Sequence, residues 1–198
     1  MKMKKLSGED FSKSVWSGGT TTQIAIAPAG ASYAARDFLW RVSSATVELE
    51  ESTFTALPDY ERRITTLTGE ITLRHDGGEP IRLRPGEVHA FSGADETQSV
   101  GRCTDFNLML RRGRADGTME ALRLEERETR LIEAEREEET LLLYAARGGC
   151  TLDDGAQRLS LAAGEAARAE GPVTLRCAAE GQSARLILCR IFAPVFNS

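Results

Sequence analysis

The chain has 198 residues, 41% of them hydrophobic and 28% charged, and a formal net charge of −5. This length allows one or two domains whose core is large enough to fold without disulfides or metals. A chain with a pI near 5.3 lacks the basic surface that nucleic acids and anionic lipids require, so we expect neither a nucleic-acid nor a membrane partner. The N-terminus is basic but precedes no apolar stretch, so we expect a cytoplasmic protein.

Short segments rich in β-branched and aromatic residues, separated by Gly and Pro, predict an all-β protein. We expect strands over 21–26, 38–48, 63–68, 70–74, 81–83, 88–91 and 104–110. Asp76 and Gly77 predict a hairpin turn, because both residue types tolerate a positive φ. Many short strands with regular turns are typical of a sandwich or barrel.

The segment 119–140 is rich in residues whose propensities favour a helix. Because 121–124 and 139–144 also fit strands, we predict a strand, a charged connection and a strand. Seven glutamates here predict a solvated face rather than a metal site. They are Glu125, Glu126, Glu128, Glu133, Glu135, Glu137 and Glu138.

One pattern of segments occurs twice, with nearly constant offsets of 79, 78 and 80 residues. Such offsets predict two copies of one β unit. We therefore expect an N-terminal unit over 1–113 and a degenerate C-terminal unit over 114–198. The aligned pairs are Gly69 with Gly148, Gly86 with Gly164, and Asn107 with Ile187.

The two copies differ in chemistry, which predicts that the first binds a ligand and the second is structural. The first carries Arg62, His89, Asp105 and Asn107, whereas the second has Ala167, Arg185 and Ile187 at the last three places.

Four cysteines are widely spaced without a CxxC pair, so we expect reduced thiols rather than a zinc site or disulfides. By alternation, Cys103 faces the same side as Asp105 and is a candidate nucleophile with His89 as its base. The alternative is that Cys103 is an inert buried side chain.

A strand, a glycine turn, a second strand and then Pro-Gly-x-x-His at 85–89 form the skeleton of a cupin. Metal-binding cupins use an HxH pair, a later Glu and a further His, which suit first-row metals. This chain has only His75 and His89 and no HxH, so we predict no metal and no cofactor. We expect His89 to be a polar wall or surface residue.

Five ordered motifs over residues 16–110 resemble the HutD/Ves family of bicupins. The resemblance implies an all-β duplicated cupin (bicupin) of two fused β-barrels or jelly rolls, with a small acidic ligand in the N-terminal barrel. It also implies a regulatory role in histidine utilisation, with formylglutamate or urocanate as candidate ligands. The chain departs from the family in a shorter Trp16 loop and in Gln23, where Glu is common. The motifs are WSGGTTTQI (16–24), DFLWRVSSA (37–45), FTALPDYER (54–62), LTG (67–69) and DFNLM (105–109).

Alternation along predicted strands places Arg41 with Ser43 on one face, and Asp105 with Asn107 on one face. Guanidinium groups in a barrel need a partner, which is either a ligand carboxylate or a protein carboxylate such as Glu48, Glu61 or Asp105. We predict a ligand site from these side chains, a glycine-threonine loop that either cradles an anion or acts as a lid, and an aromatic wall. Its residues are Thr21, Arg41, Ser43, Arg62, His89, Phe91, Asp105 and Asn107.

These residues support three functional hypotheses. The first is a non-enzymatic protein that binds a small carboxylate without metal. The second is a metal-independent isomerase or lyase acting through Arg41, His89 and Asp105. The third is an interaction module whose barrel is filled by its own side chains. Barrel edge strands also allow a homodimer.

Overall fold

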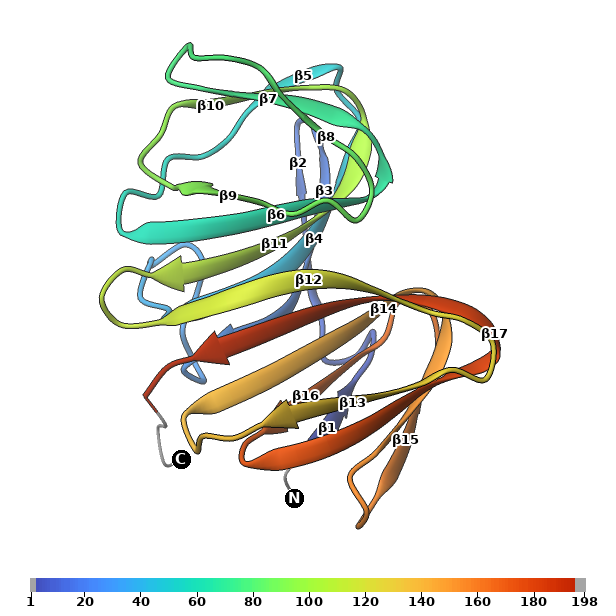
Figure 1. The fold of residues 1–198 in the computed structure, drawn as a ribbon. Helices are drawn as coiled ribbons and strands as arrows, with labels where there is room; N and C mark the ends of the chain where they lie inside the picture. Colours follow the sequence, from blue (N-terminus) through green and yellow to red (C-terminus); the bar gives the residue numbers. More distant parts are fainter. Residues whose placement is uncertain (1–2, 195–198) are drawn as a thin grey trace. The chain divides into compact units, whose positions relative to one another are not determined.

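In the computed structural model, which describes residues 3–194, every regular element is a β-strand (Figure 1). The contacts divide the chain into two compact units: residues 11–116 form one, and residues 3–10 with 117–194 form the other. The sequence predicted that residues 3–10 belong to the N-terminal unit. They belong to the other unit instead, because β1 (Met3–Leu6) pairs with β16 (Ala166–Glu170). Within residues 3–194, no helix has the length and apolarity that crossing a membrane requires.

The N-terminal unit, residues 11–116, contains two antiparallel sheets. Its strands are β2 (Ser12–Trp16), β3 (Gly19–Ala27), β4 (Trp40–Val47), β5 (Glu51–Thr53), β6 (Tyr60–Gly69), β7 (Ile71–His75), β8 (Ile81–Leu83), β9 (His89–Ser92), β10 (Thr97–Val100) and β11 (Cys103–Arg111). One sheet has the order β2-β3-β4-β11-β6-β9 and the other the order β5-β10-β7-β8. All the strands predicted in this part of the chain are therefore confirmed.

The two sheets of the N-terminal unit share one apolar core. Val47, Ile64 and Phe91 of the first sheet form one buried cluster with Leu73 and Leu83 of the second. Alternation along each strand sends every second side chain to this core, which is why the apolar residues recur at a spacing of two. The sheets therefore form two facing layers.

Strand β4 is buried on both faces. Trp40 and Val42 lie on one face and Arg41 and Ser43 on the other, and none of the four is more than 5% exposed. The inward face is identified by residues of β4 and β11 that line one cavity, as described below. Burial alone does not distinguish the two faces of this strand.

The C-terminal unit, residues 3–10 and 117–194, is built on a seven-stranded antiparallel sheet. Besides β1 and β16, its strands are β12 (Asp116–Leu124), β13 (Thr129–Ala134), β14 (Glu139–Asp153), β15 (Arg158–Leu161) and β17 (Val173–Phe192). The order is β1-β16-β14-β17-β12, with β13 also on β17 and β15 also on β14.

The segment 119–140 contains strands, as predicted, and no helix. Residues 121–124 end β12, and residues 139–144 begin β14. The charged connection between them holds an additional strand, β13, in which Ile132 and Ala134 alternate inward. All seven glutamates are exposed, which confirms the solvated face. No group of three or more potential metal ligands occurs within residues 3–194.

Each unit has a glycine with a positive φ at a matching place. Gly69 and Gly148 have φ values of 75° and 72°, a region that disfavours other residues. A Cβ on Gly69 would lie 2.4 Å from the carbonyl oxygen of Arg102, and one on Gly148 would lie 2.6 Å from that of Ser183. Both positions therefore require glycine because of backbone conformation and because of close approach by a neighbouring strand.

The two units repeat one strand order. The order β4-β11-β6-β9 of the N-terminal unit matches β12-β17-β14-β16, and β5-β10-β7-β8 matches β13-β17-β14-β15. In this comparison, β14 corresponds to both β6 and β7, and β17 corresponds to both β10 and β11. No sheet closes into a hydrogen-bonded barrel among the described strands, so the predicted closed barrels are not observed and the duplication stays a prediction.

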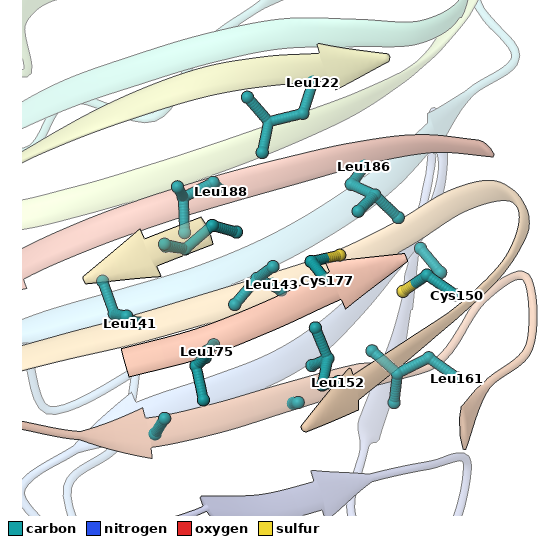
Figure 2. Close-up of a cluster of buried hydrophobic side chains, with 14 of the residues drawn as sticks. Leu122, Leu141, Leu143, Cys150, Leu152, Leu161, Leu175, Cys177, Leu186 and Leu188 are labelled. Carbon is teal, nitrogen blue, oxygen red and sulfur yellow. The ribbon is translucent and has the colours of Figure 1, made fainter. Parts of the chain in front are cut away.

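The interior of the C-terminal unit is filled by aliphatic side chains (Figure 2). All of these residues are at most 4% exposed, and two of the four free cysteines lie among them. The labelled residues are Leu122, Leu141, Leu143, Cys150, Leu152, Leu161, Leu175, Cys177, Leu186 and Leu188.

Candidate functional site: a cationic cavity in the N-terminal unit

The N-terminal unit contains a cavity of about 220 Å³ that is partly open to solvent. Six of the eight predicted site residues line it, and His89 and Phe91 do not. Arg41, Ser43, Ala45 and Val47 come from β4, Arg62 from β6, and Asp105, Asn107 and Met109 from β11; the rest are Trp16, Thr21, Tyr33, Ser52, Thr53, Phe54 and Thr55.

Arg41 is held by neutral partners. Its Nε donates to Oε1 of Gln23 at 2.8 Å, and its Nη1 donates to Oγ of Ser43 at 3.0 Å. The guanidinium carbon lies 4.6 Å from the centre of the Tyr33 ring, which is within the range of a cation–π contact. These contacts fix the side chain without neutralising its charge.

Arg62 lies against two aromatic rings, which also contact each other. Its guanidinium carbon is 4.8 Å from the centre of the Phe54 ring and 5.0 Å from that of Phe91. Nη2 donates to Oδ1 of Asn107 at 2.9 Å, whereas the buried Nε has no hydrogen-bond partner within the described chain. Burying a donor without a partner destabilises the protein. Arg62 therefore has a hydrogen-bond donor that no described residue satisfies.

Asn107 joins Arg62 to Asp105. Its Nδ2 donates to Oδ1 of Asp105 at 3.0 Å, while its own carbonyl accepts from Arg62. The Asn107 amide thus fixes the orientation of Arg62 relative to Asp105. Neither Arg41 nor Arg62 has a carboxylate within 4 Å in residues 3–194, so the predicted alternative of a structural salt bridge is not observed.

Burial dominates the electrostatics of the site. It lowers the pKa of Arg62 to about 10, against the opposing effect of Asp105, and it also lowers the pKa of Arg41. Burial raises the pKa of Asp105 to about 6, although the Asn107 hydrogen bond and both arginines oppose this rise. At neutral pH the cavity therefore holds two cations and one buried carboxylate, which leaves an excess of positive charge.

His89 does not line the cavity, and its ring contacts a second histidine, His75. Nδ1 of His75 lies 2.8 Å from the Thr97 hydroxyl oxygen, and Nε2 of His75 lies 2.9 Å from Nε2 of His89. One of the two imidazoles donates its proton to the other across this contact. The two imidazoles satisfy each other, and burial lowers the pKa of His89.

Phe91 is a core residue that supports the cavity from behind. It belongs to the buried apolar cluster, and its ring contacts both Arg62 and His75. The predicted role of Phe91 as a wall of the site is thus replaced by a role beneath the arginine.

Cys103 does not line the cavity, and burial raises the pKa of its thiol to about 12. A nucleophilic cysteine needs a lowered pKa, so the thiol is unsuited to the nucleophilic role considered from the sequence. The thiol instead packs in the apolar cluster with Val47 and Ile71.

The aromatic walls Tyr33 and Phe54 were missed in the sequence. Both lie in irregular segments, after β3 and after β5, where alternation gives no orientation. Phe54 lies within the family-like motif at 54–62, which was the one available signal. Ser17 and Gly18 form the turn between β2 and β3, Gly19 begins β3, and Thr21 lines the cavity.

The strand pairing shows which residues of the C-terminal unit stand at the places of Arg62, Asp105 and Asn107. Arg62 pairs with Met109 and Phe91, and Leu141 pairs in the same way with Arg190 and Ala169. The inward side chains matching Asp105 and Asn107 are Leu186 and Leu188, one residue beyond the positions aligned in the sequence. Leu141, Leu186 and Leu188 thus occupy the places of Arg62, Asp105 and Asn107, and Figure 2 labels these leucines within the buried cluster.

The fold and the cavity define a cupin-like β protein with a cationic interior site. The chain belongs to the HutD family, whose model matches residues 8–187. No protein with a curated description matches it significantly.

The solved structures that resemble the chain include the following three. A conserved protein of unknown function from Pseudomonas aeruginosa PAO1 is 28% identical with a TM-score of 0.82, covering 98% of this chain and 100% of its own. HutD from Pseudomonas fluorescens SBW25, determined in a formate condition, is 21% identical with a TM-score of 0.76 and the same coverage. A cupin 2 conserved barrel domain protein from Leptotrichia buccalis is 11% identical with a TM-score of 0.60, covering 96% of each chain.

Proposed function

We propose that this protein binds a small carboxylate in the cavity of its N-terminal unit, without a metal, and regulates histidine utilisation rather than catalysing a reaction. The observation that carries the proposal is the pair of buried guanidinium groups, Arg41 and Arg62. Both line one cavity, and neither has a carboxylate partner within 4 Å in residues 3–194.

The hydrogen-bonding capacity of the site supports an anionic ligand. Arg41 uses Nε and Nη1 on Gln23, Ser43 and Met109, and Arg62 uses one Nη2 proton on Asn107, so the Nη2 of Arg41 and further N–H donors of Arg62 stay available. A carboxylate accepts such donors in pairs, and these charge-assisted hydrogen bonds are the strong ones. A cavity of about 220 Å³ is smaller than the ~300–1,000 Å³ of pockets for drug-sized ligands, which favours a small metabolite.

Membership in the HutD family supports the regulatory role and the choice of candidate ligands. Formate, named for the condition of the Pseudomonas fluorescens HutD structure, is the smallest carboxylate. Formylglutamate and urocanate present the same group on a larger body. We therefore propose these acids as the first ligands to test.

Thermal shifts and calorimetric titrations with formate, formylglutamate and urocanate test the proposal. A ligand at about 100 times its Kd adds roughly 2.7 kcal/mol, which raises Tm by about 5–11 °C for a chain of this size. Arg41→Gln should abolish the shift, because it removes the charge but keeps a polar side chain. Arg74→Gln, an exposed site on β7 outside the cavity, is the matched control and should leave the shift unchanged. No shift with any acid would refute the proposal.

A metal-independent enzyme is the second candidate, and Asp105 favours it. A carboxyl group with a pKa raised to about 6 beside a cavity is suited to proton transfer near neutral pH. Turnover would appear as loss of an acid after long incubation with the protein, measured by mass spectrometry, and Asp105→Asn would abolish it. His89→Ala should have no effect, because His89 is outside the cavity. Full recovery of each acid would leave binding as the function.

We also propose that the two units arose by duplication of one cupin-like unit. Their matching strand orders and their paired glycine turns support this origin. The third hypothesis from the sequence, an interaction module, requires that no cavity lies near Arg41 and Asn107. Both residues line a cavity, which counts against this hypothesis. A homodimer stays a prediction, tested by light scattering.

A further inference from the structure

The cavity has three aromatic side chains in its wall, and two of them already face a cation. Tyr33 faces Arg41 and Phe54 faces Arg62, at 4.6 and 4.8 Å between guanidinium carbon and ring centre. Trp16 has neither a ring nor a guanidinium partner within residues 3–194. The largest aromatic surface in the wall is therefore the one without a π partner.

Trp16 is held in this position by the turn that follows it. It pairs with Gly19 at the end of the β2–β3 hairpin. A Cβ added to Gly18 would lie 2.1 Å from the indole ring, so the ring rests directly against the Gly18 backbone. The absence of a side chain at Gly18 thus provides the space for the indole.

The exposure of Trp16 is unusual for its type. The side chain is 39% exposed, on a strand whose five residues are all exposed, and yet it lines the cavity. Trp16 contributes little to a buried core from this position. A large aromatic surface that is exposed beside a site of excess positive charge is typical of a ligand contact.

We infer that the site selects carboxylates that carry a planar aromatic or conjugated body, with the carboxylate on Arg41 and Arg62 and the body stacked on Trp16. The inference rests on the proposed function, which supplies the carboxylate position. It goes further because it distinguishes between acids of the same charge. Flexible saturated acids satisfy the arginines equally well but gain no stacking from the indole.

The test uses benzoate, cyclohexanecarboxylate and formate as probes. Benzoate and cyclohexanecarboxylate have the same charge and similar size, but only benzoate has a π face. Calorimetric titration should give a Kd for benzoate that is about 2- to 12-fold lower than that for cyclohexanecarboxylate, the range expected of an aromatic pair. Formate measures binding of the carboxylate alone.

Two variants locate this preference. Trp16→Leu should bring the benzoate to cyclohexanecarboxylate ratio to about one and leave the formate Kd unchanged. Gly18→Ala should reduce the ratio as well, because the new methyl group displaces the indole while the tryptophan stays. Val15→Ala is the control, since Val15 is 84% exposed and does not line the cavity.

Tryptophan fluorescence provides a second readout. The chain has two tryptophans, and Trp40 is only 2% exposed, so a change on adding benzoate reports Trp16. The signal of Trp40 also shows that Trp16→Leu is folded.

The outcomes separate the two proposals. Equal affinity for benzoate and cyclohexanecarboxylate, or a preference that survives Trp16→Leu, overturns the stacking inference while carboxylate binding stands. Failure of formate and of both larger acids to bind refutes the proposed function and the inference with it.

Discussion

Replacing Asp105 by asparagine should stabilise the protein at neutral pH and should have less effect in acid. Burial raises the folded-state pKa of Asp105 from 3.8 to about 6. A raised pKa means that the folded state binds the proton more tightly than the unfolded state does. The associated stability is fully present below pH 3.8 and is lost as pH rises through 6, which corresponds to roughly 3 kcal/mol. The asparagine side chain carries no charge at any pH in this window and can still accept from Asn107.

The assay is denaturant unfolding of both proteins between pH 4 and 7.5. The difference in unfolding free energy between Asp105→Asn and the parent should grow by about 2–3 kcal/mol across this range, in favour of the variant. Taking the difference removes the effects of all other titrating groups. Asp59→Asn, at an exposed position of the same unit, is the control and should show no such growth. A difference that is independent of pH, or a variant less stable than the parent at pH 7.5, would refute the argument from burial.

Three further results are expected. Gln23→Glu should weaken formate binding by about tenfold, measured by calorimetry, because a carboxylate next to Arg41 would reduce the attraction between Arg41 and formate by ~1.4 kcal/mol. Unchanged affinity would contradict the role given to the neutral Gln23 amide. Gly69→Ala should lower the unfolding free energy by about 2 kcal/mol or more, and by more than Gly30→Ala, whose φ is also positive but which has open space around it. A triple variant carrying the leucines of the C-terminal unit should abolish formate binding and raise stability by roughly 1–4 kcal/mol, and retained binding would show that the anion site lies elsewhere. Its substitutions are Arg62→Leu, Asp105→Leu and Asn107→Leu.

The sequence predicted the strands well because their alternation is local. Alternation also placed Arg41 with Ser43 and Asp105 with Asn107, and each pair lines the cavity together. The strand β13 was missed because its two buried positions stand among charged residues, so its pattern is too short to distinguish from a connection.

A difference in chain length between the paired strands sets the limit of the sequence argument. Arg62 and Met109 pair in the N-terminal unit as Leu141 and Arg190 pair in the C-terminal unit, so the residue offset between the units is 79 in the first strand and 81 in the second. An offset of 80 therefore aligned Asn107 with Ile187 rather than with Leu188. His89 does not line the cavity, and its contact with His75 joins strands of two different sheets, which no local pattern encodes.

The pairing of β1 with β16 has a consequence for the order in which the protein assembles. Met3 pairs with Ala169, so β1 cannot pair until residues 7–165, which separate it from β16, have been made. Residues 11–116 have all their partners as soon as they emerge, and they can fold while β1 waits. Synthesis therefore provides every strand of the unit that contains the cavity before it provides β16, the partner of β1.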